Sequence, residues 1–556
     1  MRGRSRLMTA GAVSAIAALT LAACGSGGAG TDTGTDTGTE GAAGGEYTTN
    51  GCTPENPLIA SNTSEACGGD QLDMFLAKLV HYNTDTAEPE MDIAESIETD
   101  DNQTFTVTLK QGYNFHDGTE VQAHNFVDAW NWAAAGPNGQ AASYFFSPIE
   151  GYADVQCGGD GSDCEANPPE TEEMSGLQVV DDYTFTIKTI EAVSNLPVRL
   201  GYSAFAPQPD AFFADESEGK EDFAAKPIGA GPYQVESTSS TETVFTKFAD
   251  YGGDFPGSAD KITFVIYQDT AAAYADTVAG NLDVLDQIPT DQLAGRQFES
   301  DLPDRSEQRE SMTISYLTYS PADEQLKENK ELRQALSMAV DRETINQQLW
   351  DGARPPLDSW APPSLPDSPT GVCGEFCTYD AAAAKALYDQ SGGYDGTLYL
   401  NTNADGAGNV ATFEAVCNGW KNDLGLDCQV NQVVDFSTYN KGIDADEYTG
   451  VLRSAWLADY PSIENYLAPI YGKGADSNWS DYDNPAFDDK LAEAAAAPDL
   501  DQANALYLEA MQILAEDFPT APMQSRLETI GWSENVSNVK LTPFGKPDRI
   551  GVTVNQ

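Results

Sequence analysis

Basic residues and histidine are scarce in this 556-residue chain. It has 29 lysines and arginines and only three histidines, against 88 aspartates and glutamates, and its formal net charge is −59. A surface this acidic repels nucleic acid and anionic lipid headgroups. We therefore expect no nucleic-acid partner. Solubility is our interpretation of the charge, and the attraction of cationic ligands is the alternative.

Long apolar runs are missing beyond the first residues. Arg2, Arg4 and Arg6 precede an uncharged stretch over residues 7–21. That stretch is shorter than the roughly 20 apolar residues that a membrane-spanning helix needs. A basic start, a short apolar core and small residues before a cleavage point are typical of a secretory signal. We predict a removable signal peptide over residues 1–23.

The residues around Cys24 indicate a lipid anchor. Leu21–Cys24, with the sequence LAAC, resembles the bacterial lipobox, in which the cysteine is acylated and becomes the first mature residue. Residues 24–45 are mostly Gly, Ser, Ala and Thr, a composition typical of a flexible linker. We predict a body tethered to the outer face of the cell membrane. An ordinary cleaved signal with a chance cysteine is the alternative.

Common catalytic motifs are also missing. The chain has no G-x-S-x-G, H-E-x-x-H or G-x-x-x-x-G-K-[ST] sequence. His116 and His124 flank the turn-like pair Asp117 and Gly118, and we interpret both as surface or packing residues. Carboxylates are too abundant for any pair to indicate a glycosidase. We expect no catalytic residue, no cofactor and no metal, although an exported hydrolase stays open as a minor alternative.

The cysteines other than Cys24 are even in number and close in sequence. An even count in an exported chain predicts disulfides, and pairing between sequence neighbours is the simplest connectivity. Metal ligation is the alternative, but the tight CxxC spacing of a structural zinc site is absent. The expected pairs, which would pin surface loops, are Cys52 with Cys67, Cys157 with Cys164, Cys373 with Cys377, and Cys417 with Cys428.

Hydrophobic periodicity alternates between strand and helix patterns along the chain. A period of two predicts strands, and apolar residues spaced four apart predict helices. Mixed elements of this kind favour an α/β or α+β architecture. The expected strands are Thr104–Leu109, Tyr183–Ile187 and Lys261–Tyr267. The expected helices are Glu331–Leu349 and Asp501–Asp517, the second capped by Asp499 or Asp501.

Six segments, in order, carry a family resemblance. They are TFTVTLKQGYNFHDGTEVQAHNFVDAW from Thr104, KPIGAGPY from Lys226, AGNLDV from Ala279, LRQALSMAVDRETI from Leu332, RSAWLADYPSIENY from Arg453, and residues 478–494. Together they resemble the family 5 extracellular solute-binding proteins, the oligopeptide and dipeptide receptors of ABC importers. Each motif alone is weak, but their shared order along most of the chain is specific.

The resemblance implies an α/β, two-lobed fold of three domains with a hinged ligand cleft, of the class II periplasmic-binding-protein type. Domain I would comprise residues 46–88, 226–309 and 532–556, domain II residues 89–225, and domain III residues 310–531. The protein would be a monomer that captures extracellular peptides and delivers them to an ABC permease. Relatives of this fold also bind oligosaccharides, opines or metal chelates, so these solutes remain alternatives.

The resemblance also implies site residues. Asp459 would bind the peptide ammonium, Arg453 a carboxylate, and Trp456 would wall a side-chain pocket. The alternative for Asp459 is a structural ion pair or a helix cap. The alternative for Arg453 is pairing with an acid, and the alternative for Trp456 is core packing. Two departures stand out: Leu457 replaces a cysteine of better-known relatives, and Pro461 is shifted. Further candidates for the cleft are Tyr460, Tyr316, Tyr319, Asn62, Glu65, Asn401 and Asn403.

The lipid anchor can be tested directly. Replacing Cys24 with Ala removes the thiol that would be acylated, so the protein should appear in the culture medium. Immunoblotting of membrane and medium fractions measures the distribution. Retention of Cys24→Ala in the membrane fraction would contradict the anchor.

Overall fold

The computed structural model describes residues 44–63, 65–158, 164–267, 269–404, 408–434, 436–475 and 477–555. The predicted signal peptide, Cys24 and the linker up to residue 43 lie outside this range. The strands are β1 (Glu46–Gly51), β2 (Val80–Tyr82), β3 (Pro89–Met91), β4 (Ala94–Thr99), β5 (Thr104–Leu109), β6 (Leu177–Asp181), β7 (Thr184–Lys188), β8 (Tyr233–Thr238), β9 (Glu242–Lys247), β10 (Lys261–Ile266), β11 (Val284–Leu285), β12 (Ser306–Tyr319), β13 (Leu398–Asn403), β14 (Cys428–Val433), β15 (Val451–Leu457), β16 (Thr520–Trp532), β17 (Val536–Ser537) and β18 (Thr553–Val554).

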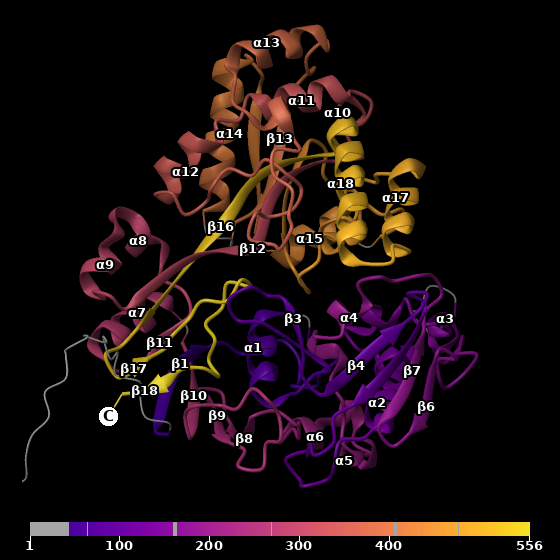
Figure 1. Ribbon diagram of the computed structural model, residues 1–556. Coiled ribbons are helices and arrows are strands. Elements are labelled where there is room, and N and C mark those ends of the chain that lie inside the picture. Colours follow the sequence, from indigo (N-terminus) through magenta and orange to yellow (C-terminus); the bar gives the residue numbers. More distant parts are fainter. Residues whose placement is uncertain are drawn as a thin grey trace, which may run out of the picture. The chain divides into compact units, whose positions relative to one another are not determined.

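Helices alternate with these strands along most of the chain (Figure 1). None of them, within the described part of the chain, is long and apolar enough to cross a membrane. They are α1 (Ala66–Phe75), α2 (Ala123–Ala134), α3 (Tyr152–Val155), α4 (Leu196–Arg199), α5 (Asp210–Ala214), α6 (Glu221–Ala224), α7 (Thr270–Ala279), α8 (Thr290–Leu293), α9 (Gln297–Asp301), α10 (Glu324–Lys327), α11 (Lys330–Met338), α12 (Arg342–Trp350), α13 (Ala381–Gln390), α14 (Asn409–Asp423), α15 (Phe436–Asp444), α16 (Ala468–Tyr471), α17 (Pro485–Ala495) and α18 (Leu500–Asp517).

Two sheets organise the chain. A mixed ten-stranded sheet has the order β14-β13-β15-β12-β16-β11-β1-β10-β9-β8, and an antiparallel sheet has the order β4-β5-β7-β6. The long strands β12 and β16 pair antiparallel from Ser306 with Gly531 to Thr318 with Thr520. They run together from the β11 end of the large sheet to β15 (Figure 1). Residues far apart in sequence therefore meet around β15.

Three large hydrophobic cores lie along this framework. Core 1 is built mainly from residues 312–523, core 2 from residues 77–230, and core 3 from residues 47–76, 206–264 and 530–552. Tyr460 is an exception, because its sequence neighbours belong to core 1 but its ring lies in core 2. This side chain joins the two cores. The three domain boundaries stay a prediction.

Most of the expected elements are confirmed, with one correction. The three strands appear as β5, β7 and β10, within a residue of their predicted limits. The single helix expected over Glu331–Leu349 is wrong: α11 ends at Met338 and α12 begins at Arg342. Asp341 causes the break, because its side chain accepts from the backbone N–H of Thr344 and caps a new helix. Asp499 caps α18.

Glycine explains one of the family-like segments. In KPIGAGPY, a Cβ on Gly229 would stand 2.0 Å from the carbonyl oxygen of Phe75, so only glycine fits there. His116 faces the same loop, where its ring meets Gly231 O at 3.1 Å and accepts from the Gly229 N–H. His116 is therefore a packing residue, as expected.

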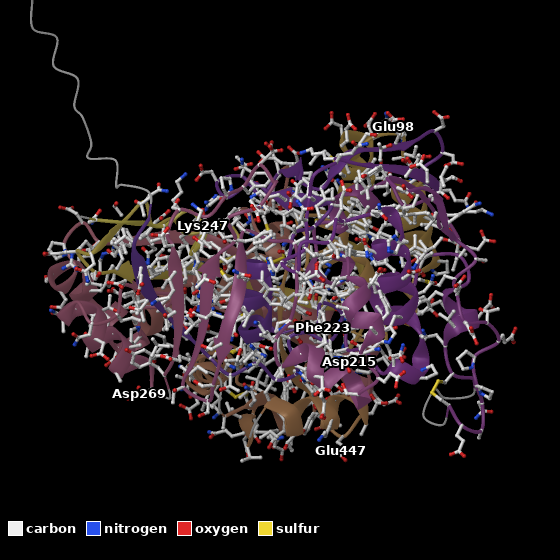
Figure 2. The ribbon with its side chains drawn as sticks, turned by 90° about the horizontal axis from the view of Figure 1, so that it is seen from below. Glu98, Asp215, Phe223, Lys247, Asp269 and Glu447 are labelled. Carbon is white, nitrogen blue, oxygen red and sulfur yellow. A yellow bond between two sulfur atoms is a disulfide. The ribbon has the colours of Figure 1, made fainter. Side chains whose placement is uncertain are left out.

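The four predicted disulfides are confirmed: Cys52–Cys67, Cys157–Cys164, Cys373–Cys377 and Cys417–Cys428. Each closes a short loop rather than joining distant segments. The exposed acids Glu98, Asp269 and Glu447 stand at the periphery (Figure 2). Phe223 is buried in a small apolar cluster. Folding therefore separates a charged exterior from the apolar cores.

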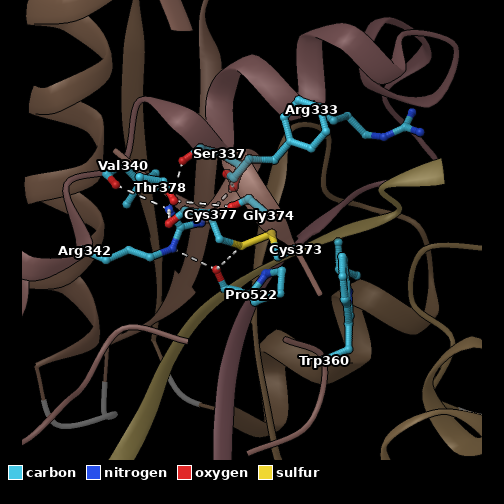
Figure 3. The surroundings of a disulfide bond; sticks show 12 residues. Arg333, Ser337, Val340, Arg342, Trp360, Cys373, Gly374, Cys377, Thr378 and Pro522 are labelled. Atoms are coloured by element: carbon cyan, nitrogen blue, oxygen red, sulfur yellow. Dashed lines mark hydrogen bonds between the residues drawn. A yellow bond between two sulfur atoms is a disulfide. The ribbon is translucent and has the colours of Figure 1, made fainter. Parts of the chain in front are cut away.

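Arg342 is a buried cation beside the Cys373–Cys377 disulfide (Figure 3). Its guanidinium donates to Pro522 O at 2.9 Å, to Ser337 O at 3.0 Å and to Ser337 Oγ at 2.7 Å. Burial lowers the pKa of Arg342 to about 10. These acceptors, all uncharged, link α11 and α12 to β16.

Replacing Arg342 with Met should destabilise the protein by roughly 2–4 kcal/mol, because buried carbonyl groups lose their donor. Urea denaturation measures the free energy of unfolding. Arg296, which is exposed and paired with Glu299, offers the matched control Arg296→Met, which should cost less than about 1 kcal/mol. Equal costs for the two variants would contradict the structural role of Arg342.

Candidate functional site

Two cavities border β15 and the turn that follows it. The Asp459 cavity, of about 350 Å³, is lined by Leu457, Ala458 and Asp459 together with residues of α1, residues 78–84, residues 201–203 and residues 542–550. The arginine cavity, of about 250 Å³, is lined by Arg453, Ser454 and Ala455 with Tyr316, Trp350, Arg354, Gln524 and Arg526. β15 thus leads from one cavity toward the other.

Aromatic and apolar side chains form much of the Asp459 cavity wall. They come from separate parts of the chain, and His81 stacks on Phe255 with 3.9 Å between ring centroids. Tyr82 is fixed by its hydroxyl, which donates to Val198 O at 2.7 Å. A rigid wall with polar tips suits an organic ligand. The aromatic lining residues are His81, Tyr82, Tyr202, Tyr251, Phe255 and Phe544.

Asp459 is held by Asn465. The Asn465 Nδ2 donates to Asp459 Oδ2 at 3.1 Å, and the backbone N–H of Asp459 donates to Asn465 Oδ1 at 2.9 Å. The same Oδ1 accepts from Trp456 Nε1 at 3.0 Å. Asn465 is 2 % exposed, so its orientation is fixed by the surrounding core. The carboxylate is therefore positioned before any ligand arrives.

Burial, with a smaller contribution from the negative charge of Glu464, raises the pKa of Asp459 to about 6, against the hydrogen bond from Asn465. Within the described residues no lysine, arginine or histidine forms an ion pair with Asp459. A desolvated carboxylate that lacks a cation favours a ligand that supplies one.

Other cations of the same cavity are already paired. Lys546 Nζ lies 2.5 Å from Asp70 Oδ1, and Arg549 Nη1 lies 3.1 Å from Asp70 Oδ2. Lys78 pairs with Asp73 at 2.9 Å. Lys78, Lys546 and Arg549 are thus each engaged with an acid of the cavity, whereas Asp459 has no cationic partner among the described residues.

The arginine cavity has the opposite character. Burial, together with repulsion from Arg526 and Arg453, lowers the pKa of Arg354 to about 9, against the attraction of Glu528. Arg354 lies over the Trp350 ring at 4.6 Å, and Arg453 lies 5.8 Å from the Phe436 ring centroid. Arg526 forms an ion pair with Glu528. Three guanidinium groups around one hollow favour an anionic ligand group, since it relieves their repulsion.

The structure brings four of the predicted site residues into these cavities. Asp459 and Glu65 line the first, and Arg453 and Tyr316 line the second. Glu65 also caps α1 by accepting from the N–H groups of Cys67 and Gly68. Asn62 itself does not line this cavity, but its neighbour Thr63 does.

The other predicted site residues do not line either cavity. The Tyr319 hydroxyl donates to Arg333 O, Asn401 donates to Thr449 O and Val451 O, and Asn403 accepts from Asn409 Nδ2. Trp456 bonds Asn465, and Tyr460 bonds Glu464. All five make structural contacts, the last two beside Asp459.

Sequence reasoning missed Asn465, Arg354 and Arg526. Asn465 lies inside the family-like segment that begins at Arg453, so its motif position was a usable signal. Arg354 follows α12 in a Gly-Ala-Arg-Pro-Pro sequence, and Arg526 lies within β16. Neither carries a local pattern, because only the fold brings them to Arg453.

Comparison with known proteins identifies the family. Residues 88–478, more than half of the chain, match the model of the bacterial extracellular solute-binding proteins, family 5. The chain belongs to this family. Over 542 residues it is 22 % identical to the oligopeptide-binding protein OppA of Bacillus subtilis, covering 95 % of this chain and 96 % of the relative.

Solved structures show the same fold. The murein tripeptide-binding protein MppA, in its unliganded open form, matches with a TM-score of 0.75 and 20 % identity, over 93 % of this chain and 99 % of MppA. Haemophilus influenzae OppA in complex with the peptide RPPGFSPFR matches with a TM-score of 0.72 and 19 % identity, over 93 % of this chain and 100 % of that OppA chain. The expected two-lobed α/β fold with a cleft is confirmed.

Asp459 should make stability depend on pH. Its folded-state pKa of about 6 lies above its ordinary value of 3.8, so the folded state binds the proton more tightly. The charged form therefore lowers the free energy of unfolding, and this loss develops between about pH 4 and pH 6 and persists above. Asp459→Asn should be more stable than the parent at pH 8 by about 1–3 kcal/mol, and nearly equal at pH 4.

Urea titrations of both proteins at pH 4 and pH 8 measure this difference. Asp73→Asn alters an exposed acid of the same cavity and should show no gain at pH 8. A difference between the Asp459→Asn variant and the parent that does not change with pH would contradict the raised pKa.

Proposed function

We propose that this protein is the substrate-binding component of an ABC importer that captures extracellular oligopeptides between its two lobes. The carboxylate of Asp459, which forms no ion pair with any described residue, supports this proposal most strongly. A peptide brings an α-ammonium, and placing it against Asp459 would supply the missing charge. Relatives named for oligopeptide binding favour the same class of ligand.

The arginine cavity supports a carboxylate at the other end of the ligand. Arg453 precedes Asp459 by six residues, and six residues of extended chain reach at most about 20 Å. Arg354 and Arg526 lie beside Arg453. A short extended peptide can therefore meet an acid at its amino end and arginines at its carboxyl end. Oligosaccharides lack this pair of charges, which disfavours them.

The Asp459 cavity leaves room for side chains near the ammonium. Its aromatic walls offer large apolar faces, and the hydroxyl groups of Tyr82, Tyr202 and Tyr251 offer polar tips. Water can fill the space that a small side chain leaves. This combination favours recognition of the peptide ends and backbone over recognition of one sequence.

The proposal also includes a lipid anchor at Cys24 and delivery of the peptide to a membrane permease. Acylation of Cys24 would anchor the protein on the extracytoplasmic face of the membrane, and residues 24–45 would tether it close to its permease, which raises its effective concentration there. The protein would act as a monomer and perform no chemistry of its own. Delivery of the peptide to the permease would follow opening of the lobes.

Peptide binding should depend on a free amino terminus. Native mass spectrometry of the purified protein with a pool of unmodified peptides of three to six residues should show complexes, and the N-acetylated pool should show none. Asp459→Asn should weaken binding at least 100-fold, because the ammonium would be desolvated without a countercharge.

Asp73→Asn is the matched control, since it removes an acid from the same cavity without removing the proposed ammonium partner, and its affinity should stay within about threefold of the parent. Equal binding of acetylated and free peptides would exclude the proposed role of Asp459. Binding of oligosaccharides in place of peptides would overturn the ligand class.

A further inference from the structure

The turn after β15 has two sides. On one side, Asn465 holds the carboxylate of Asp459 at 3.1 Å. On the other side, Tyr460, Ser462 and Glu464 point toward residues of core 2. Within one short segment, therefore, Asp459 faces the ligand cavity, whereas Tyr460, Ser462 and Glu464 form part of the contact between cores 1 and 2.

An ion pair forms the centre of that contact. Arg199, at the end of α4, places Nη2 3.2 Å from Glu464 Oε2. The two side chains are only 17 % and 10 % exposed. The Arg199 guanidinium also lies 5.3 Å from the centroid of the Tyr460 ring. A pair this shielded from water attracts more strongly than a surface pair.

Neutral donors complete the shell of Glu464. The Tyr460 hydroxyl donates to Glu464 Oε2 at 2.7 Å, and Asn195 Nδ2 donates to the same oxygen at 3.0 Å. Asn195 also donates to Ser462 Oγ at 3.1 Å. The carboxylate thus has the partners that a desolvated charge requires. These contacts join the α4 segment, which packs in core 2, to the turn after β15.

Backbone contacts extend the interface next to the ion pair. The backbone N–H of Ser194 donates to Ala495 O at 2.8 Å, and the Ser194 hydroxyl donates to Ala494 O at 3.0 Å. Both acceptors lie at the end of α17. The α4 segment is also tied to the ligand cavity, because Tyr82 donates to Val198 O.

We propose that Arg199 and Glu464, with Asn195 and Tyr460, form a latch between cores 1 and 2, and that Asn465 couples this latch to occupancy of Asp459. This inference rests on the proposed function for the identity of the ligand. Engagement of the latch would slow ligand release, because the cores must separate before the ligand leaves. Arg199 is a positioning residue here, and it does not touch the ligand.

Removing Arg199 distinguishes a latch from simple electrostatics. Arg199 is a cation, and its loss would leave the region around Asp459 more negative, which alone would hold an ammonium more tightly. Loss of a latch would instead speed dissociation. The two effects have opposite signs, so the direction of the change in the dissociation rate decides between them.

The test uses the pentapeptide Ala-Ala-Lys-Ala-Ala with free termini and a dansyl group on its lysine, displaced in a stopped-flow experiment. We expect Arg199→Gln to raise koff at least tenfold while kon stays within about threefold, and Arg199→Lys to recover part of the loss. Arg296→Gln, from an exposed Arg–Glu pair, should leave both rates unchanged. An unchanged or slower koff for Arg199→Gln would overturn the latch.

A second variant guards against loss of folding. The double change Arg199→Gln and Glu464→Gln removes both charges without leaving one unpaired, and should raise koff to the same degree. A double-mutant cycle of Arg199→Gln with Asn465→Ala measures the coupling. If Asn465 acts through the latch, the double variant should release peptide no faster than the faster of the two single variants. Multiplicative effects would overturn the coupling.

Hydrogen exchange of the ligand-free protein separates this inference from the proposed function. Arg199→Gln should lose protection at residues 193–199 and 460–466 relative to the parent, whatever the ligand is. If no peptide binds but this protection is lost, the proposed function fails and the latch stands. Unchanged protection would overturn the latch even if peptides bind.

Discussion

Asp459 keeps its carboxylate in a cavity where burial raises its pKa to about 6 and no cation of the described residues pairs with it. Such a charge costs stability unless something compensates for it. Asn465, which accepts a hydrogen bond from the Trp456 indole N–H, fixes its position, and the neighbouring cations of the cavity are engaged with other acids. Under the proposed function, the ammonium of a bound peptide would supply the missing countercharge.

The framework around Asp459 explains how one strand can border two cavities of opposite charge. β12 and β16 cross the large sheet together, and β15 pairs with β12 at their far end. This pairing carries Arg453 to the arginines contributed by β16 and by the segment after α12, and it carries Asp459 to walls built from the first and last parts of the chain. Sheet register therefore fixes the position of Arg453 relative to Asp459, and under the proposed function it would set the spacing between the charged ends of the peptide.

Local patterns predicted much of the fold. Alternation predicted β5, β7 and β10, cysteine spacing predicted the four disulfides, and motif order predicted the family. The role of Asp459 stays a prediction. The split between α11 and α12 escaped prediction, because the apolar spacing continues across the cap formed by Asp341. Arg354 and Arg526 escaped for a different reason, since tertiary pairing alone brings them to Arg453. The side chains of Tyr319 and Asn401, which were expected at the cleft, donate to the backbone carbonyl groups of Arg333 and Thr449, and their predicted role in binding stays a prediction.

Proton release on peptide binding tests the central claim most directly. At pH 6 about half of the Asp459 carboxyls would be protonated in the free protein, and a bound ammonium would ionise them all. Burial lowers the pKa of His81 and of His116 to about 4, so neither titrates at this pH. Calorimetry in two buffers of different ionisation enthalpy should show about 0.5 proton released per peptide at pH 6, and none for Asp459→Asn. Binding without proton release by the parent protein would contradict an ammonium at Asp459.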